Sequence, residues 1–185
     1  MKHYLVNLMM LLSSVGVSAQ NKVQSVSVEM LGAQNTVGIN YDSRFKCNDG
    51  LGYRIGVGFG YGNNSSFFEE KLKGVGVPLE LNYLLGKNNN KFEMGFGANL
   101  GVYHVTTTEA IYHEESPENP MGWVEFYNTS DNRFGYLMFV NVGYRYQRPN
   151  GFMFRAGFSP SFNFGDKHGL TKTAAYPYIG FGWSF

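Results

Sequence analysis

The 185-residue chain contains little cysteine, little charge and almost no charge excess of either sign. Its single cysteine excludes a disulfide framework within one chain. Charged residues make up 16% of the sequence, against roughly 25% in ordinary soluble domains. The formal net charge of +1 offers no basic excess for nucleic acid. Disulfide-stabilised scaffolds and nucleic-acid-binding proteins are therefore excluded.

Long hydrophobic runs are also missing after residue 20. A membrane-spanning helix needs about 20 consecutive apolar residues, and no such run is present. The chain is rich instead in glycine and aromatic residues, with 24 Gly, 16 Phe and 13 Tyr. Both kinds of residue are weak helix formers, and abundant aromatic and β-branched residues disfavour disorder. The composition indicates an all-β protein.

The first 19 residues carry the three parts of a secretory signal peptide. Lys2 is the positive start, residues 5–12 form a short apolar run, and Val17-Ser18-Ala19 is a small-residue cleavage site. The alternative is an N-terminal helix packed on the domain. We expect a signal peptide over residues 1–19 and a mature domain over residues 20–185.

From residue 25 onward, bulky apolar residues alternate with glycine and polar residues. Period-two alternation is typical of a β-strand whose two faces meet different surroundings. Leu137 and Phe139 are apolar exceptions on an otherwise polar face. Eight segments show the pattern, and they are residues 25–31, 36–45, 51–61, 75–85, 92–105, 134–146, 152–164 and 176–185.

The bulky face of these segments cannot lie inside a small barrel. Eight strands enclose only enough room for side chains to fill, and the glycine-rich face is too bare for a water-exposed surface. Both problems disappear if the bulky face meets lipid and the polar face lines the lumen. Closure also pairs every backbone group, as a bilayer requires. The sequence predicts an eight-stranded antiparallel up-and-down transmembrane β-barrel in contact with outer-membrane lipid.

The lumen face carries equal numbers of acids and arginines. Confined charges must be paired to offset their desolvation, so we expect an ion-pair network that plugs the barrel. A selectivity filter is the alternative. The outer half of the lumen is rich in glycine and serine and could hold a small wet cavity. The predicted network consists of Glu29, Asp42, Arg44, Arg54, Glu80, Glu93, Arg145 and Arg155.

Loop lengths predict the orientation of the barrel. The connections 46–50, 86–90 and 147–150 are short and rich in turn formers, whereas those near 62–73, 106–132 and 165–175 are longer. Outer-membrane barrels have short periplasmic turns and longer extracellular loops. We therefore expect both termini of the mature chain in the periplasm.

The longest connection, residues 106–132, is the strongest candidate for binding. Loops longer than about 15 residues are commonly functional, and aromatic side chains on a rigid scaffold are typical binding anchors. The alternative is that this segment caps the barrel mouth or extends its two strands. The candidate contacts for an extracellular ligand or protein are Met121, Trp123, Phe126 and Tyr127.

Several segments resemble those of a known class of proteins. The alternating end of the chain resembles the C-terminal strand that the outer-membrane assembly machinery of Gram-negative bacteria reads; its residues are Ile179, Phe181, Trp183 and Phe185. Residues 40–45, 78–86 and 143–147 are similar to segments of small outer-membrane β-barrel proteins of the Bacteroidota. In architecture the chain also resembles the OmpA/OmpX class. The resemblance implies fold and location, and we expect a monomeric barrel.

Candidate catalytic groups are few. His104 and His113 lie near Glu109 in the sequence, and His168 lies near Asp166, but no serine stands at a motif spacing with any of them. The sequence therefore predicts no catalytic, cofactor-binding or metal-ligating residue. A structural or binding role is the leading function. The alternatives are a lipid-modifying enzyme and a narrow channel.

Overall fold

A computed structural model of the chain describes residues 22–34, 36–46, 49–64, 70–114, 122–168 and 173–185. The expected signal peptide, Cys47 and Met121 lie outside the described residues. Eight strands form the fold: β1 (Gln24–Leu31), β2 (Val37–Arg44), β3 (Gly50–Asn64), β4 (Glu70–Leu85), β5 (Asn90–His113), β6 (Trp123–Gln147), β7 (Gly151–Phe162) and β8 (Thr173–Ser184).

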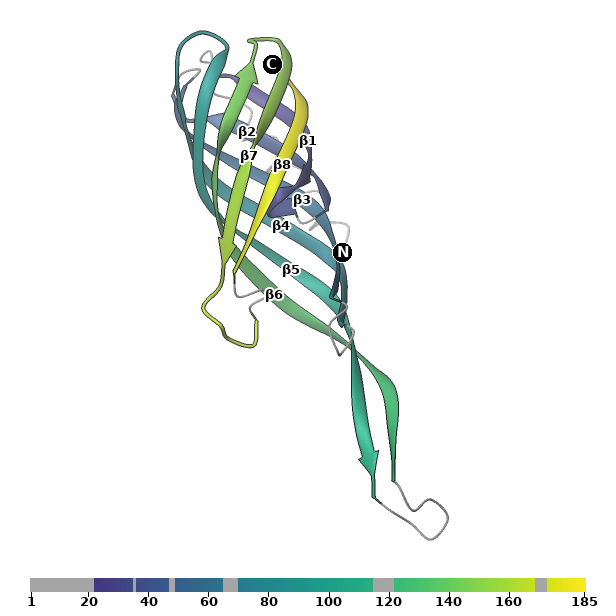
Figure 1. The fold of residues 1–185 in the computed structure, drawn as a ribbon. Helices are drawn as coiled ribbons and strands as arrows, with labels where there is room; N and C mark the ends of the chain where they lie inside the picture. Colours follow the sequence, from purple (N-terminus) through teal and green to yellow (C-terminus); the bar gives the residue numbers. More distant parts are fainter. Residues whose placement is uncertain (1–21, 35, 47–48, 65–69, 115–121, 169–172) are drawn as a thin grey trace, which may run out of the picture.

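The strands close into one antiparallel barrel in chain order (Figure 1). The last strand closes on the first, from Ser25 opposite Ser184 to Leu31 opposite Tyr178. Two ladders are interrupted beside prolines: β3–β4 pairing skips the position of Pro78, and β6–β7 pairing skips that of Pro160. Proline has no N–H to donate to a ladder. The predicted eight-stranded antiparallel barrel is confirmed.

The two faces of the wall divide as the alternation predicts. Val57, Leu81 and Trp183 point outward, with 57%, 56% and 59% of their surface exposed. Charged residues of the same strands, such as Arg54 and Glu80, point inward and are buried. The barrel therefore has an apolar exterior and a polar interior. No helix among the described residues is long and apolar enough to cross a membrane.

The two ends of the barrel differ in their connections. One end carries the short β2–β3, β4–β5 and β6–β7 turns, and the C-terminus lies at this end (Figure 1). Asn88 and Asn150 occupy the left-handed region there, with φ of 56° and 51°, a conformation that asparagine tolerates in turns. The opposite end carries the remaining connections and a hairpin that projects well beyond the wall.

The prediction of a loop over residues 106–132 was wrong in extent. Strands β5 and β6 continue as a paired hairpin as far as His113 opposite Trp123. Threonine and aromatic residues in both arms favour extended structure. Alternation failed as a signal because both faces of this hairpin lie outside the barrel. The connection expected over residues 62–73 is shorter for the same reason, since β3 reaches Asn64 and β4 begins at Glu70.

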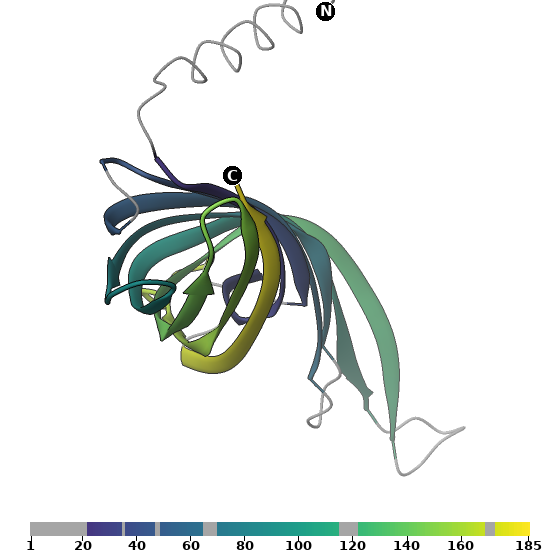
Figure 2. The ribbon, with the colours of Figure 1, turned by 90° about the horizontal axis from the view of Figure 1, so that it is seen from above.

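The short β1–β2 connection folds into the barrel as a 3₁₀ turn, η1 (Gly32–Gln34). Viewed along the barrel, this turn lies inside the ring of strands (Figure 2). Leu31 and Gly32 both adopt left-handed φ values, 62° and 65°, which reverse the chain inward. Ala33 is completely buried, and its carbonyl oxygen accepts a 2.7 Å hydrogen bond from Asn99 Nδ2 on β5. The connection between two wall strands thus packs inside the barrel.

Candidate functional site: a charged lumen and a projecting hairpin

The eight predicted charges lie together in the lumen, and each has at most 4% of its surface exposed. Four carboxylates face four guanidinium groups, so their formal charges cancel. Such a set must be internally paired, because an unpaired charge in a confined space keeps its full desolvation penalty. The structure brings all eight residues into one connected set of ion pairs.

Arg145 on β6 is the hub of this network. Its two Nη atoms donate to Asp42 of β2 at 3.1 and 3.0 Å. Its Nη2 and Nε also donate to Glu93 of the neighbouring strand, at 2.6 and 3.2 Å. The planar guanidinium suits such paired contacts, because its donors match the two oxygens of a carboxylate. One side chain therefore links two strands across the lumen.

Arg54 on β3 pairs with the two acids that form no ion pair with Arg145. It donates to Glu29 on β1 at 2.9 Å and to Glu80 on β4. Arg54 and Glu80 are also direct partners in the β3–β4 register, as expected for neighbouring strands. Asn141 Nδ2 donates to the same Glu80 oxygen at 2.8 Å. Glu80 thus depends on a single arginine for charge compensation.

The remaining charges, Arg44 and Arg155, complete the connected set. Arg44 donates to Asp42 at 2.7 Å and to Asn82. Arg155 lies between Glu29 and Glu93, at 2.9 and 3.2 Å, with its guanidinium 4.7 Å from the centre of the Tyr178 ring. The sequence reasoning missed the amides that hydrogen-bond to these ions, Asn82 and Asn141. Their position on the lumen face beside charged residues was the available signal.

Glycine makes room for the long lumen side chains. A Cβ at Gly52 would collide with the Arg44 guanidinium, one at Gly95 with the Glu80 carboxylate, and one at Gly180 would lie 2.9 Å from Arg155 Cγ. The alternation of glycine with apolar residues therefore has a steric cause. At Gly52, Gly95 and Gly180, the missing side chain leaves space on the lumen wall for a bulky lumen side chain.

Aromatic and apolar side chains enter the outer half of the lumen. Tyr103, Leu137 and Phe139 are all at least 98% buried there, and η1 packs beside Tyr178. These side chains take up part of the space in which the small wet cavity was expected, and that cavity stays a prediction. These glycines accommodate rings: a Cβ at Gly97 would lie 2.6 Å from Phe139 Cζ. The two apolar exceptions in the β6 pattern were the sequence signal for this plug.

Filling one of these glycine sites should disrupt the barrel. A Cβ at position 157 would lie 2.6 Å from Gly143 Cα and 2.7 Å from the Tyr178 hydroxyl, besides clashing with a backbone carbonyl. We expect Gly157→Leu to lower the free energy of unfolding by about 3 kcal/mol or more, at or beyond the usual range for overpacking. Urea unfolding in lipid vesicles measures this change. Ala156→Val on the lipid-facing side is the matched control and should unfold like the wild type; equal stability of the two variants would contradict the steric account.

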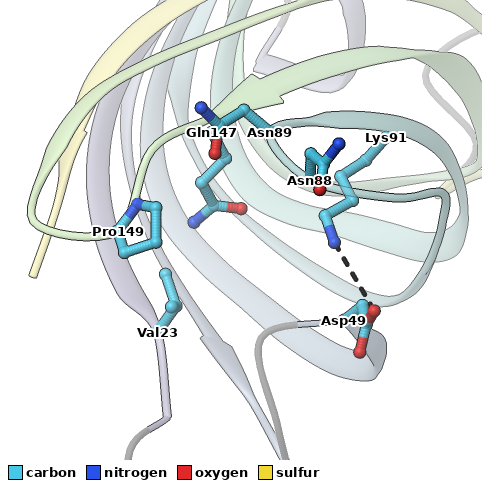
Figure 3. A pocket seen from close by; sticks show the side chains of 7 residues that line it. All are labelled: Val23, Asp49, Asn88, Asn89, Lys91, Gln147 and Pro149. Carbon is cyan, nitrogen blue, oxygen red and sulfur yellow. Dashed lines mark hydrogen bonds and ion pairs between the residues drawn. The ribbon is translucent and has the colours of Figure 1, made fainter.

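The turn end of the lumen holds a separate polar cavity of about 290 Å³ (Figure 3). Lys91 is buried within it and lies 3.5 Å from the exposed carboxylate of Asp49. Gln147 lines the same cavity and donates to Ser184 at 3.0 Å. These contacts form a polar layer between the ion-pair network and the turn end.

A ladder of polar pairs holds the two arms of the hairpin together beyond the barrel. His104 meets Asn132 at 2.8 Å, Thr106 meets Ser130 at 3.1 Å, and Thr108 donates to Asn128 at 2.8 Å. Cross-strand pairs of this kind are the unit of sheet stabilisation. The polar ladder replaces the lipid-facing apolar pairs that lie nearer the barrel.

Three of the four predicted binding residues lie near the tip of this hairpin. Trp123 stacks on His113 with ring centres 4.2 Å apart. Tyr127 donates to Glu109 at 2.6 Å, and this hydrogen bond raises the pKa of its phenol. Phe126 on the other face is 65% exposed. The structure therefore brings Trp123, Phe126 and Tyr127 to one end of the projecting hairpin.

The histidines considered as catalytic candidates have other partners. His104 contacts Asn132 as described, His113 lies 3.0 Å from Glu125, and the His168 ring lies 3.4 Å from the Phe134 carbonyl oxygen. Within the described part of the chain, no group of three or more His, Cys, Asp or Glu residues is placed to hold a metal ion.

No protein-family model matches the chain, and no curated protein sequence matches it. Solved structures do match. A major outer membrane protein of Thermus thermophilus aligns at a TM-score of 0.54 and 14% identity, over 90% of this chain and 100% of that one. The fold is that of an outer-membrane β-barrel.

Two further structures align with this outer-membrane β-barrel fold. The N-terminal β-barrel domain of Pseudomonas aeruginosa OprF aligns at 16% identity and a TM-score of 0.46, over 90% of this chain and 98% of that one. Ail, the attachment invasion locus protein of Yersinia pestis, aligns at 14% identity and a TM-score of 0.40, over 89% and 95% of the two chains.

The C-terminal strand of this outer-membrane β-barrel presents its alternate residues outward. Ile179, Phe181, Trp183 and Phe185 are 37%, 48%, 59% and 53% exposed. The strand also closes the barrel through its ladders with β1 and β7. A proposed role for these four residues in assembly is compatible with their position on the lipid-facing surface.

Proposed function

We propose that this chain is an integral outer-membrane protein of a Gram-negative bacterium, of the small Bacteroidota type that its sequence resembles. Its barrel is a closed anchor, its turns and both termini of the mature chain face the periplasm, and its β5–β6 hairpin binds a partner outside the cell. The activity is binding and not catalysis. The assembly machinery and outer-membrane lipid are its other partners.

The observation that carries this proposal is the contrast between the lumen and the hairpin. The lumen is occupied by mutually paired charges and packed rings. The hairpin continues for eleven residue pairs beyond Val102 opposite Phe134, which corresponds to roughly 35 Å of extended strand. Its last pairs carry exposed aromatic side chains. The parts of the molecule that can meet another molecule therefore lie outside the barrel.

The orientation can be tested by labelling whole cells. In a Cys47→Ser background, Tyr112→Cys should react with a membrane-impermeant maleimide on intact cells, because its side chain is 61% exposed on the hairpin. Lys87→Cys in the β4–β5 turn is the matched control and should react only after the outer membrane is permeabilised. Labelling of Lys87→Cys alone on intact cells would show that the barrel is inverted.

The closed lumen can be tested in planar bilayers. We expect the purified protein to insert without steady ion conductance, because buried ion pairs and side chains fill the interior of the barrel. A porin inserted in the same bilayer serves as the positive control. Reproducible single-channel steps from the purified barrel would instead favour the narrow channel.

A further inference from the structure

The outer part of β6 has an open edge. Pairing with β7 ends at Met138 opposite Phe162, and the Tyr136 N–H then donates to the His168 carbonyl at 2.7 Å. From Phe134 outward to Val124, no strand among the described residues pairs with β6 on this side. Apart from the His168 ring, which lies 3.4 Å from the Phe134 carbonyl oxygen, the edge is therefore a ladder of eleven residues with no strand paired to it in the part of the chain that the structure describes.

Even-numbered residues direct their backbone groups toward this edge. In an antiparallel strand, successive residues direct their N–H and C=O groups to opposite sides. Tyr136 donates outward, so the even residues farther along the strand do the same. Residues 123–134 contain neither proline nor lysine, two residues that natural proteins place on exposed edges.

The sequence of this edge is complementary to itself. When two copies are aligned antiparallel with Thr129 opposite Thr129, Glu125 of each copy faces Arg133 of the other. The same alignment places Val124 opposite Phe134 and Tyr127 opposite Asp131. Oppositely charged and apolar cross-strand pairs stabilise a ladder, and this alignment provides the charged pair twice.

Neighbouring alignments lack this complementarity. Centring the pairing on Asn128 places Glu125 opposite Asp131 of the second copy, and like charges directly opposite are destabilising. Centring it on Ser130 leaves Glu125 opposite Gly135 without its ion pair. The charges therefore select the register centred on Thr129.

We propose that the β6 edge binds a second copy of this chain by antiparallel strand addition centred on Thr129. This inference rests on the proposed function, since the hairpin must be displayed outside the membrane. The two-fold axis of an antiparallel pair is perpendicular to its strands, so the two barrels point in opposite directions. The contact joins two apposed membranes through about six hydrogen-bonded residue pairs, while each barrel stays a monomer in its own membrane.

Disulfide trapping tests the register. Thr129→Cys is introduced into a Cys47→Ser background, and vesicles carrying two differently tagged versions are mixed under oxidising conditions. Directly opposite residues come close enough for a disulfide, so mixed-tag dimers should form. Thr107→Cys, the partner of Thr129 within the hairpin, is the matched control on the other strand and should yield at least about tenfold less dimer, because a disulfide requires direct opposition.

Charge exchange tests the pairing. Glu125→Arg vesicles and Arg133→Glu vesicles should each fail to form the Thr129→Cys dimer or to aggregate, because like charges then face each other twice. Mixing the two populations restores both ion pairs, so trapping and aggregation should return. The proposal would be overturned if each single variant formed the dimer as the wild type does, or if the mixture of the two variants formed no dimer. A disulfide formed only with a different protein would also overturn it.

These outcomes are separable from the proposed function. If Tyr112→Cys is labelled on intact cells and Thr129→Cys gives no dimer, the hairpin is displayed but does not bind a second copy. If Tyr112→Cys is not labelled, the orientation itself is wrong.

Discussion

Replacing Arg145 by methionine is expected to lower the free energy of unfolding by about 3–5 kcal/mol. Arg145 makes four hydrogen bonds to Asp42 and Glu93, and its side chain is completely buried. Methionine fills a similar length without a charge, so the lumen keeps its packing and acquires one uncompensated carboxylate. Equilibrium unfolding in lipid vesicles with urea gives the free energy directly.

The control for Arg145→Met is the same substitution at Arg148, three residues farther along the chain. Arg148 is exposed beyond the last lumen layer, and Arg148→Met should stay within about 0.5 kcal/mol of the wild type, as most surface substitutions do. If Arg145→Met were as stable as Arg148→Met, the network would not be the element that holds the lumen together.

The second large effect concerns Arg54 and Glu80. Removing Arg54 leaves the Glu80 carboxylate buried with only the Asn141 amide as a hydrogen-bond partner, so Arg54→Met should destabilise strongly. In the double variant Arg54→Met with Glu80→Gln, both charges are gone. Because the buried Glu80 charge is then absent, we expect the two substitutions to lower the free energy of unfolding by less than the sum of their separate effects. The expected coupling is about 1–3 kcal/mol.

A double-mutant cycle in the same unfolding assay measures this coupling. The matched control is the cycle of Arg54→Met with Lys87→Gln, whose charges lie in different parts of the barrel, and it should be additive. Additivity of the Arg54 and Glu80 changes within about 0.5 kcal/mol would show that the two side chains are energetically independent, contrary to the ion pair between them.

The barrel wall could be predicted from the sequence because its strands separate two environments. Residues 51–61 of β3, for example, face lipid and lumen alternately, so Val57 and Arg54 fall on opposite faces with opposite burial. The set of lumen charges followed from the same rule. The identity of each partner did not, since Arg145 meets Asp42 only through the register of strands far apart in the sequence.

This rule could not predict the strands of the hairpin. Its two faces are both outside the barrel, so residues 106–113 and 123–132 show no apolar and polar alternation to mark them as strands. The inward turn η1 was equally hidden. A glycine after β1 indicates a reversal, but the direction of that reversal depends on the space enclosed by all eight strands.

The sequence by itself determined the eight segments of the barrel wall, the inside-out distribution of their side chains and the eight charges that line the lumen, because each follows from local alternation against lipid. Only the tertiary structure decided which ions pair, which rings occupy the glycine sites and where the barrel ends and the hairpin begins. Those features depend on ring closure: the position of every lumen side chain is set by the register of strands on both sides of it.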